Sequence, residues 1–400
     1  MPIPPRNETS TASPSGISTI TVDLDDRSYP IVINSGQTNA TDPSGFATHF
    51  REALGDCTHA IIVQDTAIAA SAGNAVADAL GTDDTFGTDD TQGTAGQGND
   101  DLRLSVIDVA SGEPSKSTDR IAQLWNEMLD TAADRRSVVI AVGGGVIGDL
   151  AGFAAATFTR GLRLVQVPTT LLAMVDSSVG GKTGINLPGG KNLVGSFWQP
   201  HLVWIDTDFL KTLPEREYVS GLAEVIKYGV IEDAEFFDYL ESNITAILDR
   251  APEPTRHAIA RSCESKARVV ADDERETTGR RAILNYGHTF AHAIESTAGY
   301  GAFLHGEAVS IGMQMAAELS VRLGRCPAEL LTRQTALLDA AGLPLRWKDA
   351  DVEKMIAVMA RDKKVAHGKL RFVLPDRIGN VELVGDVPAD LVSAAIEACR

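Results

Sequence analysis

The sequence has few of the features that mark secreted or membrane proteins. Only four cysteines occur in 400 residues, and Cys57, Cys263, Cys326 and Cys399 form no C-x-x-C pair, which predicts neither a disulfide framework nor a sulfur metal site. No run of 18 apolar residues is present, which argues against a membrane-spanning helix. Residues 1–18 lack the apolar core of a secretory signal and are predicted to be a disordered tail. These absences predict a cytoplasmic protein.

Basic residues are also scarce. Lysine and arginine total 36 against 54 aspartates and glutamates, so the formal net charge is -18. No basic stripe is available to neutralise phosphates, which excludes nucleic acid as the predicted partner. Part of the negative charge lies in residues 81–101, a Gly/Thr/Asp-rich insert with six aspartates and no basic residue. We expect this acidic insert to be a disordered surface loop.

The chain is long enough, and with 44% hydrophobic residues apolar enough, to form two domains. Short apolar runs alternate with helical patterns up to residue 213, which predicts a Rossmann-like α/β domain over residues 19–213. From residue 214 to 400 the spacing of apolar residues predicts an all-α domain. Strands are expected at residues 20–24, 60–64, 102–107, 137–142, 164–167 and 202–205, and helices at 150–158, 219–231, 254–273, 282–297, 307–323 and 327–341.

Histidine is rare, yet three of the eight histidines fall within eighteen positions. His288 and His292 are four residues apart, so a helix would place both imidazoles on one face. His305 follows a glycine-rich turn, and Glu224 is a carboxylate among aliphatic residues. One carboxylate and two imidazoles form a ligand set for catalytic zinc, whereas each residue taken alone fits an ordinary helix equally well. Thr289 stands where a zinc protease has its catalytic glutamate, which makes a hydrolytic zinc site less favoured.

A glycine-rich block follows the predicted strand 137–142. Gly143, Gly145 and Gly148 satisfy the G-x-G-x-x-G pattern between a strand and a helix, where backbone amides and a helix N-terminus can approach a pyrophosphate. This predicts dinucleotide binding, and the alternative is a tight turn without a ligand. No acidic residue occurs between Asp149 and Asp176, so the ribose must be bound by residues elsewhere.

Two lysines, Lys182 and Lys191, lie in segments rich in glycine and hydroxyl residues that we interpret as anion-binding loops. Ordinary solvated loop charge is the alternative. The segment is not a nucleotide-triphosphate P-loop, because that pattern needs glycine at Val175.

Together these motifs resemble the 3-dehydroquinate synthase family from about residue 100 to residue 375. The resemblance implies an NAD-binding α/β domain, a helical metal-binding domain and a reaction in the cleft between them. It also implies that NAD transiently oxidises 3-deoxy-D-arabino-heptulosonate 7-phosphate, that phosphate is eliminated, and that the reduced ring precursor closes to 3-dehydroquinate. The motifs are Gly143 to Asp149, Pro168-Thr-Thr170, Val175 to Lys182, Gly190-Lys-Asn192, Leu222 to Lys227, Asn285-Tyr-Gly-His288 and His305-Gly-Glu307.

The resemblance also implies roles for individual residues. The metal, zinc with cobalt as a substitute, is held by Glu224, His288 and His305. The substrate-binding set is Arg160, Lys182, Asn192, Lys227, Lys266, Arg281, Asn285, His292 and Lys364, with Lys266 and Arg281 for the carboxylate. His292, which is alternatively a core histidine, Lys182, Asp176 and Glu276 form the catalytic set. The cofactor set is Asp65, Glu113, Lys116, Gly143, Gly144, Gly145, Val146, Ile147, Gly148, Asp149, Thr169, Thr170, Lys182, Lys191, Phe209 and Thr212.

Two further implications concern assembly and specificity. Arg160 matches a family arginine that reaches the neighbouring subunit, which implies a homodimer. The segment from Thr277 to Arg281 is one residue longer than is usual in the family, so either Arg280 or Arg281 binds the carboxylate, and the distance to His288 favours Arg281. Other sugar-phosphate cyclases, metal-dependent polyol dehydrogenases and a non-catalytic metal and dinucleotide sensor are the alternatives.

Overall fold

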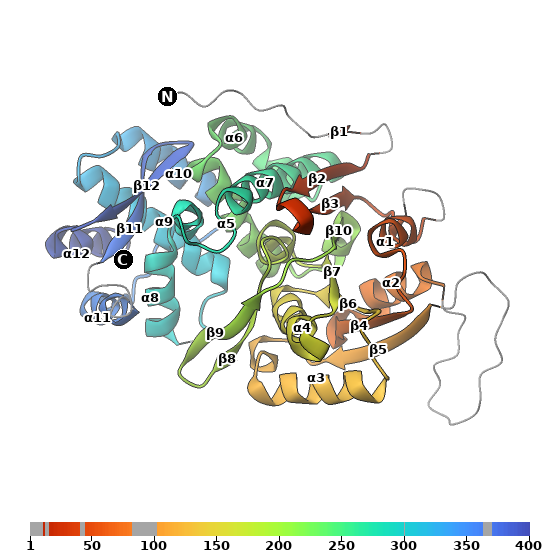
Figure 1. The fold of residues 1–400 in the computed structure, drawn as a ribbon. Coiled ribbons are helices and arrows are strands. Elements are labelled where there is room, and N and C mark those ends of the chain that lie inside the picture. The colour runs from red at the N-terminus through yellow and green to blue at the C-terminus, as the bar shows by residue number, and fades with distance from the viewer. Residues whose placement is uncertain (1–10, 13–15, 41–44, 82–101, 300, 363–369) are drawn as a thin grey trace. The chain divides into compact units, whose positions relative to one another are not determined.

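The structure, a computed structural model, describes residues 11–12, 16–40, 45–81, 102–299, 301–362 and 370–400 (Figure 1). The strands are β1 (Thr11–Ala12), β2 (Ser18–Val22), β3 (Tyr29–Asn34), β4 (His59–Asp65), β5 (Arg103–Val109), β6 (Ser137–Gly143), β7 (Arg163–Pro168), β8 (Lys182–Leu187), β9 (Gly190–Phe197), β10 (Leu202–Asp206), β11 (Arg371–Arg377) and β12 (Asn380–Gly385). The α-helices are α1 (Phe46–Leu54), α2 (Asn74–Ala79), α3 (Thr118–Asp130), α4 (Gly145–Thr157), α5 (Glu215–Ile231), α6 (Ala234–Leu248), α7 (Pro252–Asp272), α8 (His288–Ala298), α9 (His305–Arg322), α10 (Ala328–Ala340), α11 (Val352–Asp362) and α12 (Ala389–Ala398).

The chain divides into two compact units. The first comprises Met1–Thr169 and Ser177–Phe209, and the second comprises Thr170–Asp176 and Leu210–Arg400. Residues 170–176, which the sequence analysis assigned to the first domain, therefore group with the second unit. Their contacts explain this, because the hydroxyl of Tyr228 donates to the carbonyl of Val175 at 3.0 Å, and the thiol of Cys263 donates to the carbonyl of Met174 at 3.4 Å.

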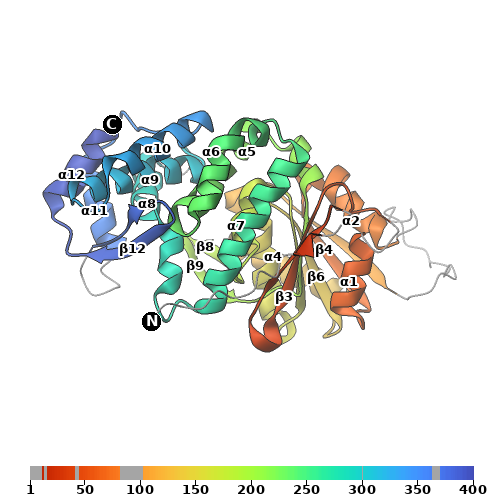
Figure 2. The same cartoon turned by 90° about the horizontal axis from the view of Figure 1, so that it is seen from above.

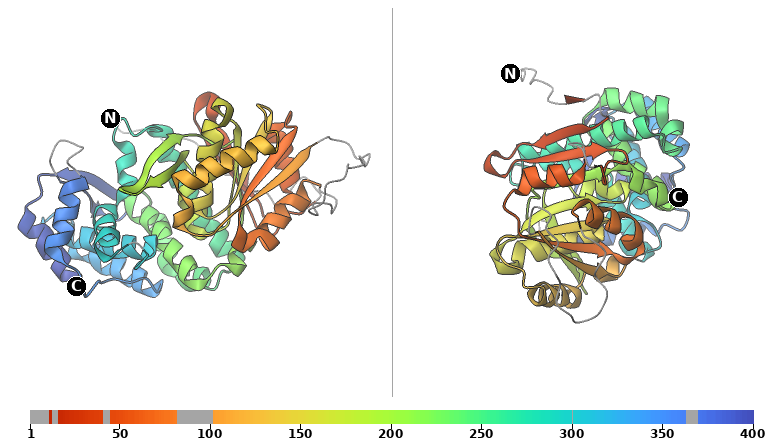
Figure 3. Two further views of the ribbon diagram at one scale, coloured as in Figure 1. Left: turned by 90° about the horizontal axis from the view of Figure 1, so that it is seen from below. Right: turned by 90° about the vertical axis from the view of Figure 1, so that its right-hand side faces the viewer.

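The first unit is built on a sheet with the strand order β1-β2-β3-β10-β7-β6-β4-β5. The strands from β3 to β5 in this order pair in parallel, whereas β2 pairs antiparallel with β3. Strand β6 is buried at every position, as expected for a parallel strand that helices cover on both faces. One face packs against α1 and α2, and the other against α3 and α4. Figure 2 shows α1, α2 and the sheet from above, and the view from below in Figure 3 shows α3 crossing the strands.

The second unit is helical around α9. This helix is buried along most of its length and packs against α5, α8, α10, α12 and β11. A helix that is apolar on all sides belongs in the centre of a core, which accounts for its run of Ala, Ile, Met and Leu residues. The hairpin β11–β12 completes the unit. The predicted order, an α/β unit followed by a helical unit, is confirmed, and the hairpin is an addition that the sequence analysis missed.

Two local predictions were wrong. The segments around Lys182 and Lys191 are strands β8 and β9 of a hairpin rather than loops. Their glycines misled the prediction; a Cβ on Gly195 would lie 2.0 Å from the carbonyl oxygen of Thr183, so the strands need glycine for close approach. The helix predicted over residues 282–297 is broken, because a 3₁₀ turn (Arg280–Asn285) ends before Gly287, which has φ +79°, and α8 follows.

Some predictions fall on residues outside the described ranges. These include most of the tail 1–18, most of the acidic insert 81–101, and Lys364. Among the described residues, no helix is both long enough and apolar enough to cross a bilayer.

We expect the buried His59 to make the first unit sensitive to acid. It is 2% exposed at the start of β4, where its Nδ1 accepts from the Arg103 guanidinium at 2.7 Å and its Nε2 lies 2.9 Å from the Ser105 hydroxyl. Burial, and then the charge of Arg103, lowers the pKa of His59 to about 4. Below its unfolded pKa of about 6.5 the unfolded chain binds the proton more readily, so stability falls from pH 6.5 towards pH 4, by up to about 3 kcal/mol.

The variant His59→Asn keeps an acceptor for Arg103 but has no group that titrates in this range. We therefore expect its urea unfolding midpoint to be nearly the same at pH 7 and pH 4.5, whereas the midpoint of the parent protein should be lower at pH 4.5. Urea unfolding at the two pH values measures the difference. An equal acid loss in both proteins would show that other groups carry the acid sensitivity.

Candidate functional site

A buried carboxylate lies at the centre of the second unit. Glu224, on α5, is 0% exposed. Among the described residues neither of its carboxylate oxygens accepts a hydrogen bond, although Oε2 is in ion-pair contact with the ammonium of Lys227, one turn further along α5. A buried anion with unsatisfied lone pairs is costly, so the arrangement requires a further positive partner.

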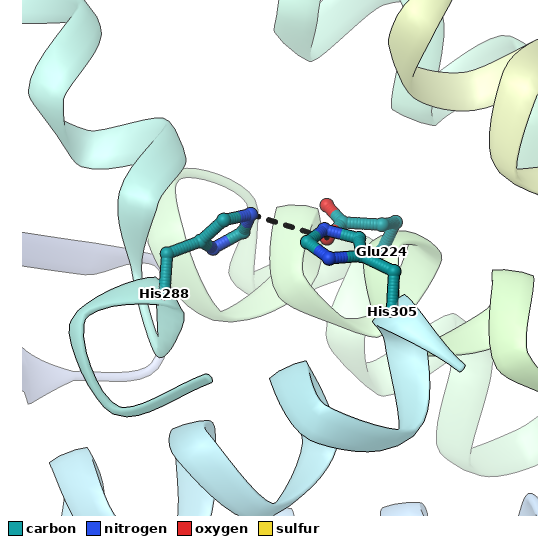
Figure 4. A group of neighbouring side chains, drawn as sticks. All are labelled: Glu224, His288 and His305. Carbon is teal, nitrogen blue, oxygen red and sulfur yellow. Dashed lines mark ion pairs between the residues drawn. The ribbon is translucent and has the colours of Figure 1, made fainter. Parts of the chain in front are cut away.

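Two imidazoles face this carboxylate. His288 Nε2 lies 3.6 Å and His305 Nε2 lies 3.8 Å from Glu224 Oε1. The three potential ligand atoms all lie within 4.8 Å of one another. Figure 4 shows the side chains converging from α5, α8 and the start of α9. One carboxylate oxygen and two imidazole nitrogens around a common point suit a divalent metal such as zinc and leave a coordination position for substrate.

Local backbone structure orients His288. Its Nδ1 lies 3.0 Å from the Tyr286 carbonyl oxygen, which makes Nδ1 the protonated nitrogen and leaves the Nε2 lone pair for the cluster. Gly287 permits the left-handed turn before α8, and Gly312 on α9 allows close packing, because a Cβ there would lie 2.3 Å from the Gly287 carbonyl oxygen. Burial, and then the positive charge of Lys227, holds the pKa of His288 well below its usual range. The neutral form is the one that binds metals.

Glu295 is a site residue that the sequence analysis missed. Its Oε1 lies 3.6 Å from His305 Nδ1, on the ring edge opposite the cluster. Burial opposes protonation of His305, but Glu295 and the charge of Glu224 outweigh burial and raise the pKa of His305. The signal was available in the sequence, since Glu295 lies seven residues after His288 and so on the same helix face.

Cations surround the cluster in the second unit. The Lys266 ammonium donates to the carbonyl of Asp176 at 2.6 Å and also binds the Asp176 carboxylate. Burial alone would raise the pKa of Asp176, but Lys266 and Lys227 outweigh burial and hold it well below its usual range. Burial lowers the pKa of Lys266, and the nearby positive charges of Arg281 and Lys227 lower it further. The structure therefore gathers Lys227 and Lys266 near the Asp176 carboxylate, with Arg281 near Lys266.

The two candidate arginines have different surroundings. Arg281 is 3% exposed, donates to the carbonyl of Glu274 at 2.7 Å and lies 3.6 Å from Glu276. Arg280 instead pairs with Glu232, and its side chain is 38% exposed. Of the two arginines, Arg281 is the one whose charge lowers the pKa of Lys266. This favours Arg281 as the arginine beside the cation group.

The remaining predicted residues of the second unit are less enclosed. The His292 ring lies 5.7 Å from the His288 ring, centroid to centroid, so the structure brings the two helix neighbours together. Asn285 and Glu276 are exposed, and Glu276 has φ +58°. Thr170 is the first residue of the segment Thr170–Asp176, and Thr212 lies near the start of the segment Leu210–Arg400. The Thr170 hydroxyl accepts a hydrogen bond from the amide of Ala173 at 3.2 Å.

In the first unit, the glycine block lies between the carboxyl end of β6 and α4. Gly144 precedes α4, and no side chain caps the amides of the first turn. Strand order reverses at β4 and β6, because β4 is followed in sequence by β5 on one side and β6 by β7 on the other. Ligands of open α/β sheets bind in the crevice at such a reversal. Asp65 ends β4 at this edge, and Thr169 follows β7, where its amide donates to the Gly143 carbonyl at 3.0 Å.

Lys116 organises the polar residues at this edge of the sheet. It is 5% exposed, and its ammonium donates to Asp149 Oδ2 at 2.7 Å and to Asn192 Oδ1 at 2.6 Å. Glu113 accepts from the side-chain amide of Asn186 at 2.7 Å. The predicted cofactor residues Glu113, Lys116 and Asp149 thus form one network with the hairpin β8–β9. Asn192, predicted to hold substrate phosphate, belongs to the same network.

The other predicted residues of the first unit lie nearer the surface. Lys182 is exposed at the start of β8, and Lys191 is half-buried in β9. Phe209 packs against the apolar core that the sheet forms with helices α1 and α2. Arg160 is exposed, has φ +72°, and has no hydrogen-bond or ion-pair partner among the described residues.

Comparison with known proteins decides the family. The model of the 3-dehydroquinate synthase N-terminal region matches residues 106–220, and that of the C-terminal region matches residues 221–365. The sequence is 62% identical over 384 residues to the 3-dehydroquinate synthase of Rhodopirellula baltica, across 96% of this chain and 98% of that protein. The chain belongs to the 3-dehydroquinate synthase family. The family's protein from Saccharophagus degradans is 45% identical, across 95% of this chain and 98% of that protein.

Solved structures agree with the fold. The 2-epi-5-epi-valiolone synthase of Streptomyces hygroscopicus subsp. jinggangensis, whose structure contains NAD+ and Zn2+, superposes with a TM-score of 0.81 at 26% identity. The match covers 94% of this chain and 98% of that one. This chain thus shares its fold with a 2-epi-5-epi-valiolone synthase.

Proposed function

We propose that this protein converts 3-deoxy-D-arabino-heptulosonate 7-phosphate into 3-dehydroquinate and phosphate, the ring-forming step of the shikimate pathway. The observation that carries the proposal is the Glu224–His288–His305 cluster in the same unit as the buried cations Lys266 and Arg281. The cluster suits a metal that binds polyol hydroxyls, and the cations suit a substrate carboxylate. Identity of 62% to a 3-dehydroquinate synthase supports the same reaction.

Glu224, His288 and His305 would hold a divalent ion, Zn2+ or Co2+, since nitrogen and oxygen ligands discriminate weakly between them. When bound, the ion supplies a Lewis acid that polarises substrate hydroxyls and stabilises developing alkoxide charge. The chain contributes a preorganised ligand set, because His288 is held neutral by burial and both histidines have a fixed partner for their outer nitrogen.

NAD would lie along the carboxyl edge of the sheet in the first unit, as NAD+ is present in the related valiolone synthase. The glycine block from Gly143 to Asp149 would receive the pyrophosphate at the start of α4, and Glu113 and Lys116 would bind the ribose. When bound, NAD supplies reversible hydride transfer at the substrate alcohol carbon, so the overall reaction is not an oxidation. Asp65, Thr169, Thr170, Lys191, Phe209 and Thr212 complete the proposed cofactor set.

The chain's own side chains would bind and orient the substrate. Lys266 and Arg281 would grip the carboxylate, the planar guanidinium being suited to two parallel hydrogen bonds. Asp176 and Lys227 would bind ring hydroxyls, and Glu276 would support Arg281, which lies 3.6 Å from it. His292 would exchange a proton near the leaving phosphate, which Lys182, Asn192, Asn285 and Lys364 would hold.

We further propose a cytoplasmic homodimer in which Arg160 enters the partner's site. Arg160 is exposed and has no hydrogen-bond or ion-pair partner among the described residues. Its backbone is strained, as is that of Thr159 with φ +48°. These features support a role for Arg160 in contact with another subunit. The four cysteines, all free thiols, are compatible with a reducing compartment.

Phosphate release tests the proposed reaction. The protein is incubated with the heptulosonate phosphate and catalytic NAD, before and after chelation and zinc restoration, while absorbance at the NADH wavelength is followed. Chelator-sensitive phosphate release without NADH accumulation is the expected result. Accumulation of NADH with other polyols would indicate a polyol dehydrogenase, turnover of a substrate without a carboxylate would indicate another cyclase, and metal binding without any turnover would indicate a sensor.

Lys116 gives a test of the cofactor site. We expect Lys116→Met, which keeps the length of the side chain but removes its charge, to raise the KM for NAD by about tenfold or more, because charged hydrogen bonds contribute roughly 1.5–3 kcal/mol each. Steady-state kinetics with varied NAD measures the effect, and Arg51→Met, at an exposed position of α1, is the control. An unchanged KM for NAD would remove Lys116 from the cofactor site.

A further inference from the structure

The start of α9 is fastened to α5 by three contacts in register. On α5, Arg216, Ser220 and Glu224 are spaced four residues apart, so they lie along one face of the helix. In the same order they meet Glu307, Gly306 and His305. The last contact is part of the candidate metal cluster. The Ser220 contact lies one helical turn before it along α5, and the Arg216 contact lies two turns before it.

The outermost contact is a two-point ion pair. Arg216 Nε donates to Glu307 Oε1 at 2.7 Å, and Arg216 Nη2 donates to Glu307 Oε2 at 2.8 Å. Glu307 Oε2 also accepts the amide of Leu304 at 2.8 Å, which satisfies an amide at the beginning of α9. One carboxylate therefore joins the residue immediately before His305 to the helix that carries Glu224.

The middle contact is a close approach of backbones. The amide of Gly306 donates to the Ser220 hydroxyl at 3.1 Å. A Cβ on Gly306 would lie 1.8 Å from the Ser220 carbonyl oxygen. The start of α9 can therefore approach the backbone of α5 this closely only because the residue after His305 is glycine.

His305 has more need of such support than the other two candidate ligands. Its side chain is 30% exposed, against 12% for His288 and 0% for Glu224. It is also the first residue of α9, where the backbone lacks the full set of helical hydrogen bonds. A ligand in this position is held by its surroundings rather than by burial.

We propose that Arg216 and Glu307 are positioning residues that fix His305 at the distance from Glu224 that a metal ion requires. The inference rests on the proposed metal site, but neither residue belongs to the cluster of candidate ligands. Arg216 and Glu307 act by holding the start of α9 on α5, and their loss lets His305 move away from the other two ligands.

Cobalt binding to the full-length protein tests the proposal. Arg216→Lys keeps the charge but cannot form the two-point contact, and Glu307→Ala removes both the ion pair and the bond to Leu304. We expect the Kd for Co2+ to rise about tenfold for Arg216→Lys and up to about 100-fold for Glu307→Ala, the range seen when residues supporting a metal ligand are lost. The Co2+ absorption spectrum should shift at the same time, because the ligand geometry changes.

A matched ion pair in the same unit controls for general loss of stability. Arg333, on α10, donates to Glu241 Oε1 at 3.0 Å and to Asp238 at 2.6 Å, and this pair also joins two helices. Arg333→Lys should leave the Kd for Co2+ within about twofold of the parent value, even where it lowers the Tm as Arg216→Lys does. Equal Kd values in the Arg216, Glu307 and Arg333 variants and the parent would overturn the positioning role. Failure of the parent protein itself to bind Co2+ would instead overturn the metal site.

Discussion

Replacing Glu224 with glutamine is expected to lower kcat by roughly 1,000-fold or more and to remove tight metal binding. The amide has the size of the carboxylate but no charge, and it is a poor ligand for zinc or cobalt. Glu224 is also the only carboxylate in the cluster that the described residues form, so two histidines would remain. A Lewis acid is worth several kcal/mol of transition-state stabilisation, which sets the expected size of the loss.

The measurement is metal content after dialysis, with kcat determined on the same preparation. Stability must be followed in parallel, because Lys227 is 1% exposed and loses its carboxylate partner in this variant. Glu215→Gln, at an exposed position in the first turn of α5, controls for loss of a glutamate from the same helix. A folded Glu224→Gln protein that retains one metal ion per chain and near-parental kcat would exclude Glu224 as a ligand.

Features encoded by short-range patterns were predictable from the sequence. The apolar run from Ser137 to Val142 leads into the glycine block as expected, because a buried parallel strand needs apolar residues on both faces. The four-residue spacing of His288 and His292 placed their rings side by side, since helical periodicity fixes which residues share a face.

Features that depend on long-range approach were not predictable in this way. The glycines of β8 and β9 have the composition of a loop, and only the facing strand shows that they permit close pairing. Lys266 and Asp176 are 90 residues apart in sequence, so no local pattern indicates that they pair. The contacts of Arg216 with Glu307 span 91 residues and connect two helices whose register is set by packing around α9.

The choice between Arg280 and Arg281 shows the limit of motif spacing, and it leads to the second large effect. We expect Arg281→Gln to lower kcat/KM by about 100-fold or more, because a buried guanidinium that binds a carboxylate through two hydrogen bonds contributes several kcal/mol. Arg280→Gln should lower kcat/KM by less than about threefold, since the Arg280 side chain is 38% exposed and pairs with Glu232. Steady-state kinetics with the heptulosonate phosphate compares the two variants.

Arg281 also has a structural contact, which a substrate-side control separates from carboxylate binding. Its guanidinium donates to the carbonyl of Glu274, so its loss could disturb the turn before α8 without any direct role in binding. Inhibition constants are therefore measured for two ring analogues that differ only in a carboxylate or a hydroxymethyl group. Direct binding predicts that Arg281→Gln weakens the carboxylate analogue alone, because only that analogue loses a charged partner. Equal weakening of both analogues would assign Arg281 to the turn and leave Lys266, 5% exposed and paired with Asp176, as the carboxylate-binding cation.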